Sequence, residues 1–271
     1  NSFFANVGKE INSNFPDSAK CTIKSPPSIY TFKLMDITVT DVVKKLQSLN
    51  HSSSIDVLDM DSKLLRLSCS ITAPYLTHIF NMSIHNCIYP DDFKLSRVTP
   101  IYKGKGPTNS LSNYRPISIT CHISKLLESH VNNQLMAYLL EHDFITPDQS
   151  GFLRKHSTQT ALHKIVDNWL FNIDDSLLTA VCSLDISKCF DSLDHKILLQ
   201  KLKWYGIQGN EHLWFTDYLK ERKQIVRLNG LISTEQVLTT GVPQGSVLGP
   251  LLFLVYCNDL SQNIGSGSCD M

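Results

Sequence analysis

The spacing of apolar residues along the chain predicts more helix than strand. Apolar side chains recur every three or four positions in several segments, which is the period of a helix with one buried face. The predicted helices cover 40–49, 64–84, 122–141, 158–174, 196–204, 211–220 and 246–260. The segment 122–141 has the longest apolar face, so we expect it to be a helix of the core.

Three other regions predict strands. The segments 93–102 and 114–120 are rich in β-branched residues and are joined by a loop of Gly, Pro, Asn and Ser, which is typical of a hairpin. A second hairpin is predicted on either side of Gly230. The apolar run 177–184 predicts a further strand, with Asp185 at its end. Because helices alternate with antiparallel hairpins rather than with parallel strands, the pattern indicates an α+β architecture.

The composition indicates a globular chain with no net charge. The 271 residues are 42% hydrophobic, which supports a sizeable core, and 25 basic residues balance 25 acidic ones. Any nucleic-acid contact must therefore come from a local patch. The region 93–127 is such a patch, although a charge run is more often a solvated face. It has no acidic residue and six basic ones: Lys94, Arg97, Lys103, Lys105, Arg115 and Lys125.

The cysteines and the termini narrow the class of protein further. None of the eight cysteines falls in a Cys-x-x-Cys pair, which disfavours zinc fingers and disulfide frameworks. No apolar run is long enough to span a bilayer, and the N-terminus lacks a signal pattern, so we expect an intracellular protein without a membrane partner. The chain begins at Asn1 and stops at Met271, which suggests a fragment.

The first candidate motif is the string from Asp185 to His195. A carboxylate at a strand end suits a metal site, although an isolated aspartate there more often starts a turn. We expect Asp194 to cap the helix that begins near His195, and Asp191 to anchor the turn through backbone hydrogen bonds. His195 is expected to be a packing or capping residue rather than a general base. Phe190, taken alone, reads as a core residue.

The second candidate motif is Gly241-Val242-Pro243-Gln244-Gly245, which continues to Pro250. Its Gly and Pro residues allow the backbone to run close to a ligand, with the amide of Gln244 beside it. The alternative is a turn that leads into a helix, in which Pro and Gly only mark the start of the helix.

Together, these two motifs resemble those of the reverse transcriptases of non-LTR retrotransposons of the LINE type, close to jockey-like elements. The segments 98–103 and 113–118 resemble the fingers strands of the same polymerases, and the segments 149–152 and 156–162 resemble the region near the template. The resemblance runs from about residue 3 to residue 260 and is strongest from Lys94 onward.

The resemblance implies a right-hand polymerase fold with fingers and a partial palm, whose antiparallel sheet packs on helices and whose thumb is absent. Residues 1–90 would be N-terminal connector and support helices. Residues 91–176 would form the fingers and the fingers–palm helices. Residues 177–271 would form the partial palm and end before the family's aromatic-Ala-Asp-Asp motif.

The resemblance also implies a chemistry, the transfer of dNTPs onto a primer by a two-metal mechanism. Asp185 would be the catalytic carboxylate, and Asp185 and Ile186 would be ligands of the two Mg²⁺ ions. The remaining substrate-binding residues would be Lys103 and Arg115 at the triphosphate, Phe190 beneath the sugar, and Gln244 and Gly245 in the loop. A ring at Phe190 would clash with a 2′-hydroxyl and so select dNTPs.

The implied partners are an RNA template, a DNA primer and dNTPs. The resemblance allows an endonuclease domain fused in the full-length polyprotein, and the parent element would be found in nucleus and cytoplasm. Since 271 residues hold one of three catalytic carboxylates, we expect negligible polymerase activity from the chain alone.

Two other functions are alternatives to a polymerase. A non-catalytic relic of a transposon would at most bind nucleic acid through its fingers. A nucleotide cyclase shares a strand-end carboxylate, but it has no use for the Pro-Gln-Gly loop or for the basic hairpin.

Overall fold

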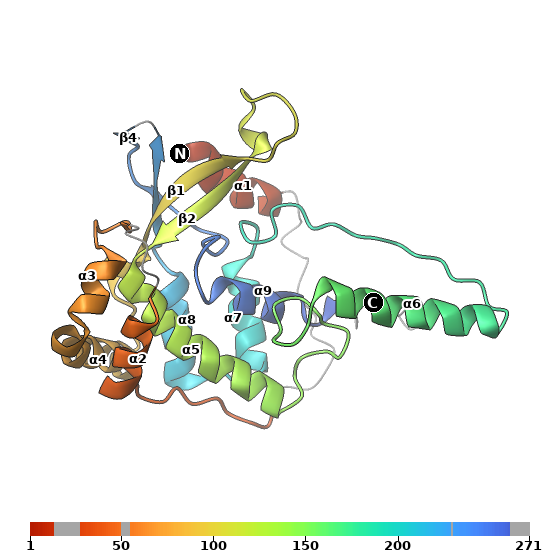
Figure 1. Cartoon of the computed structure of the whole chain (residues 1–271), viewed down its shortest axis with the longest axis horizontal. Helices are drawn as coiled ribbons and strands as arrows, with labels where there is room; N and C mark the ends of the chain where they lie inside the picture. The colour runs from red at the N-terminus through yellow and green to blue at the C-terminus, as the bar shows by residue number, and fades with distance from the viewer. Residues whose placement is uncertain (14–27, 50–54, 229, 261–271) are drawn as a thin grey trace.

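The computed structural model describes residues 1–13, 28–49, 55–228 and 230–260. Within these residues the chain is a mixed α+β structure with a small sheet and nine α-helices, as the sequence pattern predicts (Figure 1). None of the described helices is both long enough and apolar enough to cross a membrane.

The predicted helices and the two predicted hairpins occur in the predicted order, but 64–84 is divided into two helices and the helix Ser2–Ser13 was not predicted. The helices are α1 (Ser2–Ser13), α2 (Val39–Gln47), α3 (Ser62–Leu67), α4 (Cys69–Asn86), α5 (His122–Glu141), α6 (Thr158–Asp174), α7 (His195–Trp204), α8 (Gly209–Leu219) and α9 (Gly249–Cys257). The strands are β1 (Leu95–Tyr102), β2 (Tyr114–Thr120), β3 (Lys223–Leu228), β4 (Leu231–Ile232) and β5 (Gln236–Val237).

The sheet confirms both predicted hairpins and adds a pairing that joins them. β1 and β2 are antiparallel from Ser96 opposite Thr120 to Tyr102 opposite Tyr114. β3 pairs antiparallel with β4 and with β5. β3 also lies parallel to β1, although more than a hundred residues separate the two strands in the sequence.

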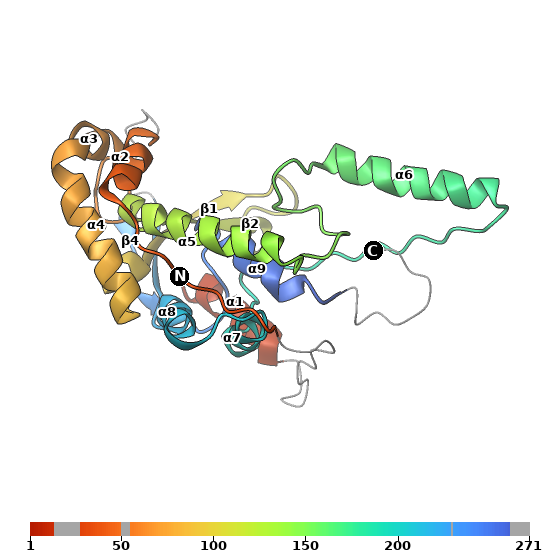
Figure 2. The ribbon, with the colours of Figure 1, turned by 90° about the horizontal axis from the view of Figure 1, so that it is seen from below.

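The core lies between the helices below the sheet (Figure 2). Four leucine and valine side chains of α5 are fully buried there: Leu127, Val131, Leu135 and Leu139. Side chains of α4, α7, α8 and α9 complete the same cluster. The prediction that 122–141 forms a core helix is therefore confirmed.

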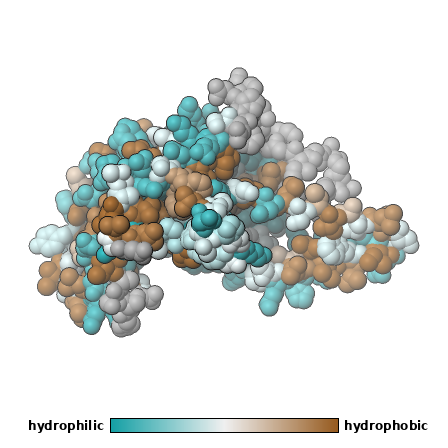
Figure 3. Space-filling view, turned by 90° about the horizontal axis from the view of Figure 1, so that it is seen from above, coloured by the Kyte–Doolittle hydropathy of each residue, from teal (hydrophilic) through white to brown (hydrophobic). Residues whose placement is uncertain are grey.

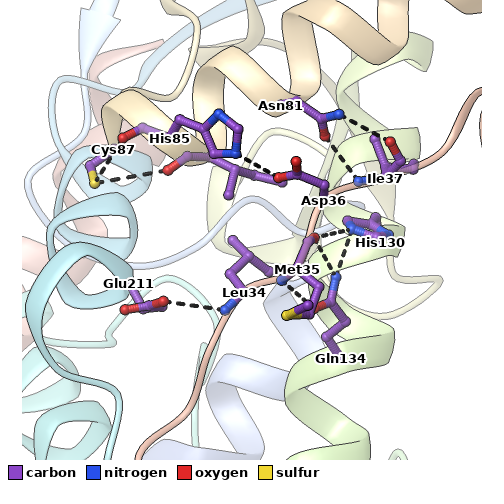
Figure 4. Close-up of polar contacts among 11 residues, drawn as sticks. Leu34, Met35, Asp36, Ile37, Asn81, His85, Cys87, His130, Gln134 and Glu211 are labelled. Carbon is purple, nitrogen blue, oxygen red and sulfur yellow. Dashed lines mark hydrogen bonds and ion pairs between the residues drawn. The ribbon is translucent and has the colours of Figure 1, made fainter.

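An extended segment before α2 ties the N-terminal helices to this core (Figure 4). The backbone N–H of Met35 donates to Oε1 of Gln134 on α5 at 2.7 Å, and Nε2 of Gln134 donates to the carbonyl of Met35 at 3.1 Å. Asn81 on α4 makes the same reciprocal pair with the backbone of Ile37, at 2.9 and 3.1 Å. The segment thus pairs with side-chain amides as a strand would pair with a neighbouring strand.

The predicted cap at Asp194 is confirmed, and Ser157 caps a second helix. The hydroxyl of Ser157 accepts the N–H of Thr160 in a capping box at the start of α6. The carboxylate of Asp194 accepts the N–H groups of Lys196 and Ile197, at 2.7 and 3.1 Å, at the start of α7.

The prediction of a strand at 177–184 is wrong, and an antiparallel palm sheet ending at Asp185 is not formed. This segment is extended and exposed, and it pairs with no described strand. A strand needs a neighbour for its backbone N–H and C=O groups, and apolar alternation alone does not supply one. With α6, the segment forms an arm that projects from the body (Figures 1 and 2).

The arm is also unusually apolar on its surface. None of the α6 side chains is buried, and Phe171 and Leu184 are 69% and 72% exposed. Hydrophobic side chains gather along it in the space-filling view (Figure 3). The periodicity of residues 158–174 therefore predicts the helix correctly. The apolar side chains that such periodicity usually buries are, however, not buried in this helix.

Helix α1 docks on the body through Asn1, which directly precedes it, and through Gly8. Asn1 donates from Nδ2 to the carbonyl of Gln224 at 3.0 Å and accepts from Nε2 of Gln224 at 2.9 Å. Gly8 packs so closely that a Cβ there would overlap the carbonyl oxygen of Asp191 and the hydroxyl of Thr240. The absence of a side chain at Gly8 is therefore a condition of this docking.

Replacing Gly8 by Ala is expected to destabilise the fold by about 1–3 kcal/mol, because the methyl group must push α1 away from backbone that cannot move freely. Urea denaturation measures this change. Lys9→Ala, at the exposed neighbouring position, is the matched control. Equal midpoints for the two variants would contradict the docking.

Candidate functional site

The two sequence motifs meet in space. The backbone N–H of Val242 donates to the carbonyl of Phe190 at 2.8 Å, and the N–H of Gly241 donates to the carbonyl of Leu193 at 2.8 Å. The hydroxyl of Thr240 donates to the carbonyl of Asp191 at 3.2 Å. The turn 187–193 and the loop 240–245 are therefore joined along their backbones, and we call this contact the turn–loop seam.

A side-chain contact extends the seam. Nε2 of Gln244 donates to both carboxylate oxygens of Asp191, at 3.2 and 3.1 Å. The expectation that Asp191 anchors the turn through backbone hydrogen bonds is thus wrong for its carboxylate, whose described partner is the amide of Gln244. Burial raises the pKa of Asp191 to about 6, although the Gln244 amide and the ammonium groups of Lys188 and Lys103 act to lower it.

His195 takes the structural role expected of it. Its Nε2 lies 2.7 Å from the carbonyl of Gly241, so it adds a side-chain contact to the seam from the start of α7. Burial lowers the pKa of His195, which keeps the ring neutral, and the hydrogen bond to Gly241 opposes that shift. A neutral ring that donates to a carbonyl is a packing and positioning group.

The loop is also held from the side of the β1–β2 hairpin. The carbonyl of Gln244 accepts the N–H of Ser118, in β2, at 2.8 Å. Gly245 has a φ of +135°, and a Cβ there would overlap the carbonyl oxygen of Ser118. The close approach that the sequence motif predicts for this glycine is thus an approach to β2. Its contact with a substrate stays a prediction.

Glu128 supports the loop from the core and was missed by sequence reasoning. Its fully buried Oε2 accepts the N–H groups of Val247 and Leu248, at 2.7 and 3.2 Å, and the hydroxyl of Tyr89 donates to its Oε1 at 3.2 Å. These N–H groups directly precede α9, whose N-cap residue Leu248 has no side chain that can accept a hydrogen bond. The only signal in the sequence is one acid within the apolar face of 122–141.

The burial of Glu128 has an electrostatic cost that the surroundings reduce. Burial raises the pKa of the carboxyl, while the guanidinium of Arg222 and the two backbone N–H groups lower it. Arg222 is itself fully buried, with its guanidinium carbon 4.7 Å from the ring centre of Tyr218. The loop therefore depends on a buried network of charged and aromatic groups.

The two predicted cations lie on the hairpin beside the loop. Lys103 directly follows β1, and its Nζ donates to the carbonyl of Ser112 at 2.8 Å. Arg115 is exposed on β2, opposite Ile101. Its neighbour Pro116 lines a small cavity together with Asp191 and Gln244. The charge of Lys103 acts to lower the pKa of Asp191, so this cation lies within electrostatic reach of the seam.

Phe190 sits in an aromatic cluster. Its ring centre lies 5.3 Å from that of Phe253 on α9 and 6.0 Å from that of Phe152. The side chain is half-buried, so one part of the ring packs and another part is open to solvent. The structure thus brings Phe190, Gln244 and Gly245 together, with the cations of the hairpin nearby.

Asp185 and Ile186 are placed differently from the other predicted residues. Both are exposed in the extended segment that leads into the turn. No group of three or more His, Cys, Asp or Glu side chains in the described part of the chain is arranged to hold a metal ion. Mg²⁺ needs only one or two protein carboxylates beside phosphate and water oxygens, so Asp185 fits as one ligand of a site and not as a whole site.

Truncating Glu128 to Ala is expected to destabilise the fold by about 2–4 kcal/mol, because two buried N–H groups lose their acceptor. Glu128→Gln should cost less, since the amide oxygen still accepts both. Urea denaturation gives the free energies, and hydrogen exchange at Val247 and Leu248 reports the local change. Unaltered exchange of these two amides in Glu128→Ala would contradict the role of this carboxylate.

Asp191 predicts an unusual dependence of stability on pH. Its folded pKa of about 6 lies above the unfolded value of 3.8, so the folded state holds the proton more tightly. The stabilisation is complete below the unfolded pKa and is lost as pH rises through about 6. Relative to Asp191→Asn, the wild type should lose up to about 3 kcal/mol between pH 4 and pH 7. Parallel stability curves for the two proteins would contradict this.

Comparison with known proteins identifies the family of the chain. Residues 102–268 match the family described as reverse transcriptase (RNA-dependent DNA polymerase). The chain is 30% identical over 240 residues to the probable RNA-directed DNA polymerase from transposon BS of Drosophila melanogaster, which covers 86% of this chain and 26% of that protein. It is 34% identical over 195 residues to the probable RNA-directed DNA polymerase from transposon X-element of the same fly, covering 69% and 21%.

A third relative is the RNA-directed DNA polymerase from mobile element jockey, also of Drosophila melanogaster. It is 31% identical over 202 residues, covering 74% of this chain and 22% of that protein. The chain thus spans about a quarter of the length of these curated relatives. With its two motifs joined at the turn–loop seam and matched across most of the chain, this protein belongs to the reverse transcriptase family, as a domain of the non-LTR retrotransposon type.

Proposed function

We propose that this chain forms the nucleotide-binding part of an RNA-directed DNA polymerase that extends a DNA primer on an RNA template. The observation that carries the proposal is the turn–loop seam, which bonds the backbone of Phe190 to the loop that carries Gln244, next to a basic hairpin. The relatives named above are RNA-directed DNA polymerases, and the family uses divalent metal ions.

The division of the chain follows from the same proposal. Residues 91–176 would be the fingers with the helices that connect them to the palm, and residues 177–271 would be a partial palm. Residues 1–90 would support both. The hydrogen bond between Ser118 in β2 and the carbonyl of Gln244 supports a shared boundary, because it joins the proposed fingers to the proposed palm.

Lys103 and Arg115 would bind the triphosphate. Both are exposed, and both stand on the hairpin that carries Ser118 against the loop. An arginine can bind phosphate with two parallel hydrogen bonds, while a lysine acts as a point charge. The rigid antiparallel pairing of β1 and β2 holds the two at a constant separation.

The carboxylate of Asp185 and the carbonyl of Ile186 would bind the Mg²⁺ ions of the complete enzyme. Bound ions of this kind supply charge stabilisation for phosphoryl transfer. Asp185 is exposed and lies only a short turn before Phe190, so it can reach a phosphate placed over the seam. Its exposure leaves its carboxylate accessible to an ion.

Phe190 would select the sugar. Its contacts with Phe253 and Phe152 hold the ring in place, and a ring that cannot retreat excludes a 2′-hydroxyl by contact. Gln244 and Gly245 would complete the nucleotide site from the loop side.

A second candidate is a transposon relic that binds nucleic acid without catalysis. The observation in its favour is the exposed, unpaired segment that carries Asp185. We expect negligible Mg²⁺-dependent dNTP incorporation by residues 1–271 alone. An endonuclease domain in the parent polyprotein, and an intracellular location in nucleus and cytoplasm, belong to the same proposal.

Nucleotide binding tests the proposal directly. Purified protein with a dideoxy-terminated primer on an RNA template and Mg²⁺ is titrated with dTTP by calorimetry. Lys103→Ala and Arg115→Ala should each weaken binding about three- to thirtyfold, because each removes a charge-assisted contact. Lys105→Ala, an exposed lysine of the same loop, is the matched control. Equal dTTP affinity in all three variants would overturn the assignment of the hairpin.

A further inference from the structure

The contact between Asp191 and Gln244 fixes which end of the Gln244 amide faces the carboxylate. An ionised carboxylate has acceptors only, whereas a glutamine amide has one end that donates and one end that accepts. Nε2 of Gln244 lies 3.2 and 3.1 Å from the two oxygens of Asp191. Only the nitrogen end can face this carboxylate favourably, so the opposite end, Oε1, is turned away from Asp191.

The backbone around the pair leaves Asp191 little freedom to move. Its N–H donates to the carbonyl of Lys188 at 2.9 Å, and its carbonyl accepts from the hydroxyl of Thr240. Gly8 on α1 packs against the same carbonyl and the same hydroxyl. The carboxylate is therefore presented to Gln244 from a fixed backbone.

The carboxylate of Asp191 is ionised at neutral pH, because burial raises its pKa only to about 6. The ammonium groups of Lys188 and Lys103 both lower the pKa of Asp191 against the effect of burial. At neutral pH, the carboxylate then acts as an acceptor only. The carbonyl of Gln244 accepts from Ser118 and its side-chain nitrogen donates to Asp191, whereas its Oε1 has no hydrogen-bond partner within the described part of the chain.

We propose that Asp191 is a positioning residue, which orients the amide of Gln244 so that the loop offers Oε1, a hydrogen-bond acceptor, to a donor group of the bound nucleotide. This inference rests on the proposed function, because it assumes that Gln244 contacts the nucleotide. Asp191 itself touches Gln244 and not the substrate. Its effect on binding passes through the orientation of one side chain.

Two variants of Asp191 test its effect on the orientation of the Gln244 amide. Asp191→Leu removes the acceptor and should weaken dTTP binding about three- to tenfold, the value of one hydrogen bond. Asp191→Asn keeps an oxygen that can accept from Gln244, but its amide can also turn its nitrogen to Oε1. It should therefore fall between the wild type and Asp191→Leu. Asp194→Asn is the matched control, because Asp194 caps α7 without a described contact to Gln244.

The experiment has two readouts at pH 7.5, both on the chain of residues 1–271. The side-chain amide of Gln244, labelled with ¹⁵N, is followed by NMR in the free protein, and dTTP is titrated in the presence of Mg²⁺ and a dideoxy-terminated primer on an RNA template. We expect hydrogen-bonded amide protons in the wild type and in Asp194→Asn, and their loss in Asp191→Leu. The affinity for dTTP should follow the same order, independently of melting temperature.

The outcomes distinguish the positioning role of Asp191 from the proposed function. An amide signal of Gln244 that is unchanged in Asp191→Leu would overturn the inference, whether or not dTTP binds. If the wild type binds dTTP and Asp191→Leu binds it equally tightly, the inference is overturned as well. The proposed function then stands. A wild-type chain that binds no dTTP would overturn the proposed function, and with it the nucleotide contact of Gln244.

Discussion

The turn–loop seam is the contact on which the candidate site depends. It consists of backbone hydrogen bonds from Gly241 and Val242 to the turn, with the pair of Asp191 and Gln244 at its edge. Neither segment is a regular element, so neither has a ladder of its own to keep it in place. The neighbours supply that order. β2 bonds to the loop through Ser118, α5 caps the following helix through Glu128, and α1 packs under the turn through Gly8.

This arrangement explains why a polar site can sit beside a dense core. The buried carboxylate of Glu128 would be costly alone, but two N–H groups, a tyrosine hydroxyl and the nearby guanidinium of Arg222 compensate it. The same network holds α9 in line, and α9 presents Phe253 to Phe190. Support from the core therefore reaches the aromatic ring and the loop amide, two groups of the proposed nucleotide site.

Much of this structure could be predicted from the chain because it depends on local patterns. The hairpin of β1 and β2, the core helix α5 and the caps at Ser157 and Asp194 follow from periodicity, turn residues and side-chain oxygens. The motifs also identify the family, because their residues recur at definite spacings. The meeting of the turn with the loop was expected only through the resemblance.

What escaped prediction depends on partners distant in the sequence. The parallel pairing of β1 with β3 and the contact of Glu128 with Val247 join segments about 120 residues apart, and no local pattern encodes them. The run 177–184 has the composition of a strand, yet it lies exposed because no described strand pairs with it. Asp191 reads as a turn residue, whereas its carboxylate bonds to the side chain of Gln244, fifty-three positions on.

Photocrosslinking with a nucleotide tests the central claim most directly. A dTTP analogue with a photoreactive base is irradiated on the protein with Mg²⁺ and a primed RNA template, and the labelled peptides are identified by mass spectrometry. If the seam holds the nucleotide, the label should lie in 187–193, in 240–247 or in the β1–β2 hairpin, and excess unmodified dTTP should remove it. Competed labelling confined to α3, α4 or the arm would contradict the account.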